Sequence, residues 1–192
     1  MRWIGYCWML MLLLGGCTQT DQPPSTANQF AIYIFDRSTV PGLGQTTDTA
    51  WPVLQALPLT KSAFTVTEAL LLSYHWPTQT ITFTNPWGQT DLDAPSYMWG
   101  GDGAFIVVYQ GQRLFGGKVV AAESPRRFDY PAMALSQEFI LMENPELQGK
   151  LVYSFHPRSA MMYPPQSQFL AADPMIAEAV KTHLRQLGKL VE

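Results

Sequence analysis

Short β-type segments recur between residues 30 and 155 and are separated by stretches rich in glycine and proline. They are rich in β-branched and aromatic residues, which favour extended strands over helices: Phe30–Phe35, Thr80–Thr84, Ala104–Tyr109 and Leu151–Phe155. Within residues 80–84 the alternation places Ile81 and Phe83 on one face and threonines on the other, as in a half-buried strand. A chain with many short strands has to join them into a sheet that buries one face, and this requirement dominates its choice of fold.

The clearest local pairing is a β-hairpin. The segment Ala104–Tyr109 is followed by Gln110-Gly111 and then by Gln112–Phe115. Glycine in a two-residue turn allows the positive φ that tight hairpins require. We therefore expect these two segments to be antiparallel neighbours.

Two helices are expected. Thr65 and Glu68 have the spacing of a capping box, which predicts a short helix through Ala69–Leu72. At the other end of the chain, Asp173 is a good N-cap and Pro174 a good first helical residue. An apolar stripe at helical spacing follows, and a glycine can end the helix: Ile176, Val180, Leu184, Leu187 and Gly188.

These elements indicate one α+β domain over residues 30–192. Hairpins dominate the pattern, so the expected sheet is mainly antiparallel, and a ferredoxin-like arrangement is one form it could take. A short helix and the C-terminal helix would pack against it. The segment Met133–Met142 fits a strand or a helix equally well.

The first sixteen residues have the pattern of an export signal. Arg2 is followed by the apolar run Ile4–Leu14, which is shorter than the roughly 20 residues of a membrane-spanning helix. A charged start, an apolar run of this length and small residues after it are typical of a removed signal peptide. Residues 1–16 are therefore expected to be absent from the mature protein.

The end of that segment, Leu14-Gly15-Gly16-Cys17, resembles the lipobox of bacterial lipoproteins. The resemblance implies that Cys17 becomes the lipid-bearing N-terminus, although Gly15 departs from the more usual alanine or serine. An ordinary cleaved signal peptide or a buried N-terminal helix are the alternatives. Thr18 follows the cysteine where aspartate usually marks inner-membrane retention, so the resemblance favours the outer membrane in an organism that has one.

Cysteine counting agrees with lipidation. Of the two cysteines, Cys7 lies in the segment to be removed, which leaves Cys17 as the only one in the mature chain. The mature domain would have no disulfide and no thiol nucleophile. Residues 17–29 are polar and proline-containing, and are expected to form a flexible tether that places the domain outside the membrane, facing the periplasm or the cell exterior.

Charge excludes one class of partner. The chain has 12 lysines and arginines against 15 aspartates and glutamates, a formal net charge of −3. Neither this balance nor the sequence pattern provides a basic stripe able to neutralise phosphates, so nucleic-acid binding is not expected.

The sequence lacks the common catalytic and phosphate-binding motifs, including GxSxG, a Walker loop, HExxH and CxxC. A hydrolase acting on cell-wall or lipid material remains an alternative, and it would use Asp91, Asp102 or Glu123 with one of the histidines His75, His156 and His183. Asp91, Asp93 and Asp102 could seat calcium, but solvated turns explain them better. Met161-Met162 could bind a soft metal, although methionine more often fills a core. No metal and no cofactor are expected.

One loop and one basic pair stand out as candidate contact residues. Trp87, Tyr97 and Trp99 lie in the polar, glycine-rich segment Asn85–Gly103, and exposed aromatic residues favour glycans, partner proteins or lipid headgroups. The alternative is that they fold back as a lid over the sheet. Arg126 and Arg127 could grip a carboxylate or a phosphate. These five residues support the leading hypothesis, a non-enzymatic module that binds a ligand, an envelope protein or a cell-wall partner.

The order of segments resembles a group of small uncharacterised bacterial envelope proteins. The resemblance rests on Leu57-Pro58-Leu59, Thr67–Tyr74, Thr80–Thr84, Phe105–Gly117 and the ending Asp173-Pro174 to Gly188-Lys189-Leu190. It implies a strand, helix, strand, hairpin and strand order and assigns no catalytic residue. More distantly, the pattern is similar to the periplasmic head module of SecD, which is ferredoxin-like, although the loop Asn85–Gly103 departs from it. A structural scaffold without a ligand is the third hypothesis.

Overall fold

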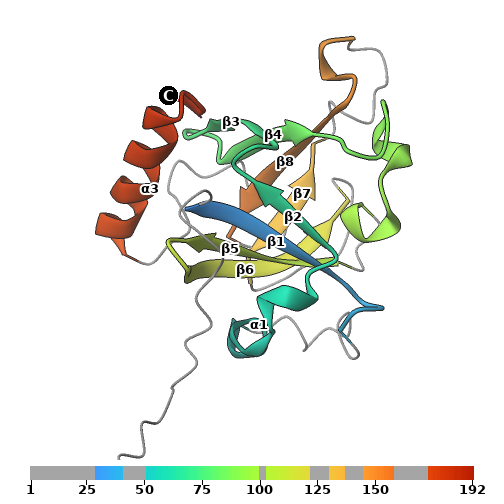
Figure 1. Ribbon diagram of the computed structural model, residues 1–192, viewed down its shortest axis with the longest axis horizontal. Helices are drawn as coiled ribbons and strands as arrows, with labels where there is room; N and C mark the ends of the chain where they lie inside the picture. Colours follow the sequence, from blue (N-terminus) through green and yellow to red (C-terminus); the bar gives the residue numbers. More distant parts are fainter. Residues whose placement is uncertain (1–28, 41–50, 100–102, 122–129, 137–144, 158–172) are drawn as a thin grey trace, which may run out of the picture.

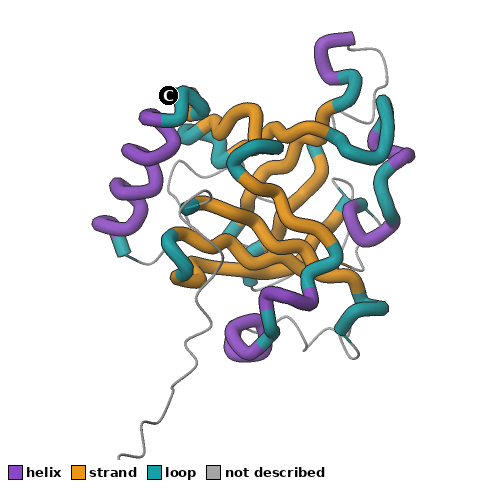
Figure 2. The backbone as a smooth tube through the Cα atoms, in the orientation of Figure 1, coloured by secondary structure: helices purple, strands orange, loops and turns teal. Residues whose placement is uncertain are grey.

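The computed structural model describes residues 29–40, 51–99, 103–121, 130–136, 145–157 and 173–192. Within these residues nine strands form one sheet in the order β2-β1-β5-β6-β7-β8-β4-β3-β9 (Figure 2). Their bounds are β1 Phe30–Asp36, β2 Phe64–Thr67, β3 Leu71–His75, β4 Thr80–Thr84, β5 Gly103–Tyr109, β6 Gln112–Val120, β7 Ala132–Leu135, β8 Lys150–His156 and β9 Leu190–Val191. The helices are α1 (Trp51–Ala56) and α3 (Pro174–Gln186), with short 3-10 turns at Leu59–Lys61, Asp91–Asp93, Ser96–Met98 and Pro145–Leu147.

The sheet curls back on itself. Only residues 68–70 separate β2 from β3, although β2 lies at one end of the strand order and β3 is next to the other end. The two ends of the sheet must therefore approach each other at this turn. Neighbouring strands are antiparallel except for the pairs β6–β7 and β3–β9, which are parallel. The α+β class is as expected, whereas this mixed nine-stranded order does not confirm a ferredoxin-like arrangement.

The main core fills the inside of the curl and is rich in aromatic rings. Phe83 stacks on Tyr153 with ring centroids 5.7 Å apart, and Phe105 lies 5.4 Å from Phe155. Val180 and Leu184 of α3 join this core from one side. Residues of the segment between β4 and β5 join the same core, and Figure 1 places that segment on the side opposite α3.

A second, smaller core lies under helix α1, which is not among the helices expected from the sequence. Leu54 of α1 is fully buried against Phe35 and Ile106. The guanidinium of Arg113 donates hydrogen bonds to three carbonyls at the end of this helix, those of Leu54, Gln55 and Leu57. These bonds satisfy carbonyls that the helix itself leaves without partners.

Several sequence predictions are confirmed. The hairpin forms between β5 and β6, with Tyr109 opposite Gln112. Gln110 and Gly111 both have positive φ, 49° and 78°, as a tight primed turn requires. The strands predicted at 30–35, 80–84 and 151–155 are β1, β4 and β8, and the ambiguous segment begins as strand β7, with residues 137–144 outside the described residues.

The short helix predicted over residues 65–72 is wrong. That stretch is β2, a tight turn and then β3. The Thr65–Glu68 spacing does not act as a capping box, because the Glu68 carboxylate accepts a hydrogen bond from the backbone N–H of Phe30 on a different strand. The β-branched residues of 64–67 favour strand, and pairing with β1 outweighed the local helix signal.

The C-terminal helix is confirmed. The Asp173 side chain accepts a hydrogen bond from Met175 N at 2.8 Å, and Gly188 has φ 68° just past the helix end. Val180 and Leu184 are buried as predicted, but Leu187 is exposed at the C-cap. The sequence did not predict β9, which follows directly and pairs with β3. Neither helix among the described residues is long and apolar enough to cross a membrane.

Candidate functional site

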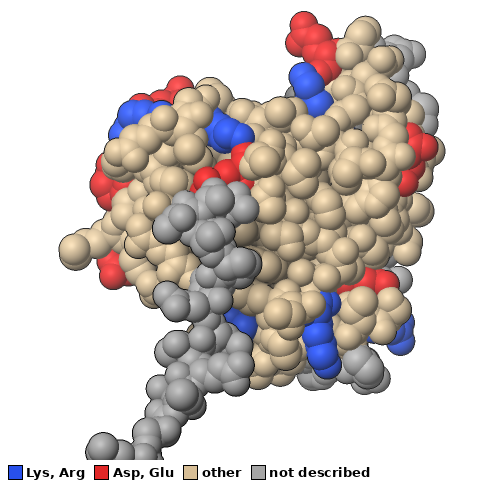
Figure 3. All heavy atoms as spheres, viewed as in Figure 1, with Lys and Arg blue, Asp and Glu red and all other residues tan. Residues whose placement is uncertain are grey.

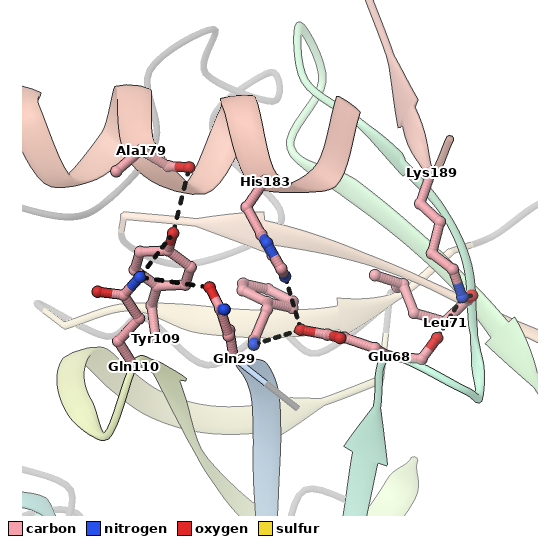
Figure 4. Close-up of polar contacts among 9 residues, drawn as sticks. Gln29, Glu68, Leu71, Tyr109, Gln110, Ala179, His183 and Lys189 are labelled. Atoms are coloured by element: carbon pink, nitrogen blue, oxygen red, sulfur yellow. Dashed lines mark hydrogen bonds and ion pairs between the residues drawn. The ribbon is translucent and has the colours of Figure 1, made fainter. Parts of the chain in front are cut away.

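A buried carboxylate–imidazole pair lies where the two ends of the sheet meet helix α3. Glu68 Oε1 lies 2.7 Å from His183 Nε2 and also accepts the Phe30 N–H at 2.7 Å (Figure 4). Both side chains are nearly buried, with 11% of Glu68 and 13% of His183 exposed. One carboxylate oxygen thus joins the β2–β3 turn, the start of β1 and helix α3.

Lys189 completes this connection from the far side of the same turn. Its Nζ donates hydrogen bonds to the carbonyl oxygens of Glu68 and Leu71. Its own carbonyl accepts from Tyr74 N at 2.7 Å, which starts the pairing of β9 with β3. The end of the chain therefore holds the β2–β3 turn through both backbone and side chain. We call Glu68, His183 and Lys189 the polar clamp.

Beside the polar clamp, Tyr109 and two glutamines form a second set of hydrogen bonds. The Tyr109 hydroxyl donates to the Ala179 carbonyl at 3.5 Å, and Gln110 Nε2 donates to that hydroxyl and to Gln29 Oε1, each at 3.3 Å (Figure 4). Burial, and next the nearby negative charge of Glu68, raise the pKa of Tyr109. The phenol therefore stays protonated and remains a donor at neutral pH.

These two sets of bonds border an open groove of about 580 Å³ between α3 and the β5–β6 turn. Its walls come from one face of the helix and from two other parts of the chain: Gln29, Tyr109, Gln110, Met175, Glu178, Ala179, Thr182, His183 and Gln186. The volume lies within the range of clefts that bind small molecules. The groove borders Gln29, at the point where the residues predicted as a tether reach the domain.

The aromatic residues singled out in the sequence lie elsewhere, in the segment between β4 and β5. Trp87 is partly buried, packs against the core, and its ring centroid is 4.6 Å from that of Phe64. Tyr97 is also partly buried, and burial followed by the charge of Asp36 raises its pKa. Both side chains thus help to cover the core.

Trp99 is the most exposed of the three predicted aromatic contact residues, at 36%. Its indole N–H already donates to the Ala94 carbonyl at 3.0 Å. The neighbouring 3-10 turn is fixed to the core by a 2.7 Å hydrogen bond from the Tyr153 hydroxyl to the carbonyl of Met98. The basic pair Arg126 and Arg127 lies outside the described residues, as do Cys17 and Met161-Met162.

The structure describes only part of the residue set proposed for a hydrolase. Asp91 lies in a 3-10 turn in the segment between β4 and β5, while Asp102 and Glu123 lie outside the described residues. His75 Nδ1 lies 2.6 Å from the Thr78 hydroxyl at the β3–β4 turn, and His156 is buried at the end of β8. His183 contacts a different carboxylate, that of Glu68, which accepts a backbone N–H with the same oxygen.

Asp91 and Asp93, two of the three aspartates considered for calcium, lie in a 3-10 turn, and Asp102 lies outside the described residues. Asp93 Oδ2 accepts from the backbone N–H of Thr90 at 2.9 Å and from its hydroxyl at 3.0 Å. These hydrogen bonds, the backbone one first, lower the pKa of Asp93. Among the described residues no group of three or more His, Cys, Asp and Glu side chains is placed to hold a metal ion.

Chemically, the groove combines hydrogen-bonding groups with apolar wall. Glutamine amides donate and accept, the Thr182 hydroxyl does both, and the polar clamp holds the helix that carries half of these groups, Thr182 and Gln186. In the sequence, His183 stood out only as one of three histidines open to a hydrolase, and Glu68 as part of a capping box. The three glutamines have no distinguishing spacing, so no sequence signal marks the groove.

No protein-family model, curated protein or solved structure matches this chain.

Proposed function

We propose that this protein is a lipid-anchored bacterial envelope protein whose α+β domain is a non-enzymatic binding module. The observation that carries the binding role is the groove along α3, where neutral hydrogen-bonding side chains from three separate parts of the chain face one open space. Binding sites commonly combine such convergent polar groups with a rigid scaffold. The polar clamp supplies that rigidity, because it joins α3 to both ends of the sheet.

The sequence supports the proposed location in the cell envelope. The order of a basic residue, an apolar run, two glycines and Cys17 supports removal of residues 1–16 and acylation of the cysteine. Eleven residues lie between Cys17 and Gln29, and the twelve Cα–Cα steps of a fully extended chain span at most about 43 Å. Under this proposal the groove works close to the membrane surface, in reach of wall polymers and envelope proteins.

The anchor is tested by mass spectrometry of the native protein extracted from membranes. The proposal predicts an N-terminal peptide that begins at Cys17 and carries fatty acyl chains, and a Cys17→Ser variant that lacks them. A native chain that begins elsewhere, or an unmodified Cys17, would contradict it.

The binding role is tested by adding charge and bulk to the groove. Ala179 is an exposed residue of α3 that lines the groove, and Ala56 is an exposed alanine at the end of α1, which packs on the other core. We expect Ala179→Arg to reduce retention of the detergent-solubilised full chain on an envelope preparation at least fivefold, and Ala56→Arg to leave retention unchanged. Equal retention of the two variants would refute the groove as the binding surface.

The aromatic residues Trp87, Tyr97 and Trp99, together with Arg126 and Arg127, are the alternative contact surface. The same retention assay with Trp99→Ala distinguishes the two. The proposal expects no loss for Trp99→Ala, since its packing and hydrogen bond are internal.

A further inference from the structure

The groove lacks the groups that bind anions. Neither lysine nor arginine is among the described residues that line it, and its one carboxylate, Glu178, adds negative charge. Ligands with phosphate or carboxylate groups are usually held by cationic side chains, and most tightly by arginine. On the face shown in Figure 3 the charged side chains lie mainly near the periphery, and most of the surface is uncharged. The groove therefore favours an uncharged ligand.

The polar groups in the groove suit a ligand that carries many donors and acceptors. Gln186 offers an amide that both donates and accepts, and Thr182 adds a hydroxyl. Gln110 Nε2 already donates to Gln29 Oε1 and to the Tyr109 hydroxyl, so these two glutamines offer a ligand the other atom of each amide, Gln110 Oε1 as an acceptor and Gln29 Nε2 as a donor. The groups come from three parts of the chain, since Gln29 precedes β1, Gln110 is in the β5–β6 turn and the other two are on α3. Sugar hydroxyls and acetamido groups present the matching alternation of donors and acceptors.

Two apolar side chains lie among these polar groups. Met175 is 81% exposed at the first turn of α3, and Ala179 lies one turn further along the same helix face. A thioether and a methyl group provide a small apolar contact, of a size suited to an acetamido methyl group. The groove is open to solvent, so that a ligand can enter it without a change in the fold.

A peptide fits this groove less well. Extended peptides usually add to a free strand edge or insert apolar side chains into deep pockets. Here the Gln29 carbonyl, the backbone acceptor at the start of β1, already accepts from Gln110 N at 2.7 Å. The apolar side chains Met175 and Ala179 in the wall are exposed and do not form a deep pocket. The two rings that line the groove, those of Tyr109 and His183, pack against each other at 5.6 Å.

We infer that the α3 groove binds a neutral oligosaccharide of N-acetylated amino sugars. This inference rests on the proposed function, because the anchor would hold the domain within reach of envelope glycans, which contain N-acetylated amino sugars. It names the ligand class for the groove that the retention assay tests.

The experiment is calorimetric titration of the detergent-solubilised full chain with three probes: an N-acetylglucosamine trimer, a glucose trimer and a neutral decapeptide. We expect the N-acetylated trimer to bind about tenfold more tightly than the glucose trimer, since the acetamido group adds a hydrogen bond and a buried methyl group. The decapeptide should not bind.

A matched pair of variants ties binding to the groove. Thr182→Val with Gln186→Met removes a hydroxyl and an amide from the groove, and Thr60→Val with Gln55→Met makes the same changes at exposed positions near α1. The first variant should bind the N-acetylated trimer about tenfold more weakly, through the loss of two hydrogen bonds, and the second should bind it normally.

The inference is overturned if no trimer binds, if both trimers bind equally, if the decapeptide is the probe that binds, or if both variants bind alike. Its failure can be distinguished from that of the proposed function. If Ala179→Arg still lowers retention on the envelope but the N-acetylated trimer does not bind, the glycan ligand is rejected and the binding module is kept. If Ala179→Arg leaves retention unchanged and the trimer does not bind, the binding module is rejected as well.

Discussion

The two ends of the core are closed by different kinds of interaction. At the α3 end, Glu68, His183 and Lys189 join three parts of the chain through hydrogen bonds. At the opposite end, the segment between β4 and β5 covers the core with Trp87, Tyr97 and Met98. The first end is held by a few directional contacts, and the second by apolar area spread over several side chains.

The comparison shows that aromatic residues in a polar, glycine-rich segment can belong to the core instead of the surface. The aromatic residues predicted as contacts pack on the core or bond within their own segment. The polar residues around α3, which form no recognisable sequence motif, meet at an open groove. The two ends should therefore differ in how stability and binding respond to mutation.

The largest effect is expected at the polar clamp. Glu68→Ala removes the acceptor shared by Phe30 N–H and His183, leaving two nearly buried donors without it. We expect a loss of about 3 kcal/mol in the free energy of unfolding, measured by urea denaturation. Glu178→Ala, on the exposed face of α3, should change it by less than about 0.5 kcal/mol. Equal effects of the two substitutions would show that the clamp contributes nothing to stability.

A smaller effect is expected when an aromatic ring is removed from the other end. Trp87→Ala deletes a half-buried ring that packs on Phe64, and should cost about 2 kcal/mol in the same assay, below the 3–5 kcal/mol typical of a fully buried aromatic residue. Trp87→Phe keeps a ring at this position and should recover more than half of the loss. If alanine and phenylalanine have the same effect, packing at this end is not the source of its stability.

Trp99→Ala should be milder still. The side chain is 36% exposed and makes one hydrogen bond, to Ala94, so its loss should cost about 1 kcal/mol. Thermal unfolding followed by circular dichroism would measure the difference. A loss of stability as large as that of Trp87→Ala would mean that the exposed Trp99 stabilises the segment between β4 and β5 as much as the half-buried Trp87 does.

The smallest effect is a pH-dependent one in the same loop. Hydrogen bonds from Thr90 lower the pKa of Asp93 in the folded protein, so its carboxylate contributes stability above the ordinary aspartate pKa of about 3.9. That contribution is lost as the pH falls through the lowered value. Asp93→Ala should therefore be less stable than the natural chain at pH 7, and the difference should shrink as the solution is acidified.

The control for this prediction is Leu92→Ala, a change at a neighbouring side chain that is 60% exposed and carries no charge. The difference between this variant and the natural chain should not vary with pH. A difference for Asp93→Ala that grows on acidification would have the wrong sign for a carboxylate stabilised in its charged form.

Elements built from local interactions could be predicted from the sequence. The β5–β6 hairpin depends on Gln110-Gly111, and helix α3 on Asp173, Pro174 and its apolar stripe. Each of these signals lies within a few residues of the element that it determines. Tertiary contacts agreed with them, so the predictions held.

Elements decided by distant contacts could not be predicted. The Thr65–Glu68 spacing is a valid local helix signal, but Glu68 pairs with His183, 115 positions away in the sequence, and residues 64–67 pair with β1. Strand β9 has two residues and exists because β3 offers it a free edge. The groove likewise unites Gln29, Gln110 and Gln186, whose proximity no local pattern reveals.

Amide hydrogen exchange of the full chain, with and without the N-acetylglucosamine trimer, tests most directly which end of the core binds. We predict slower exchange in peptides covering residues 174–186 and 109–112, with no change over residues 87–99. Slower exchange confined to residues 87–99, or no change in either region, would contradict this prediction.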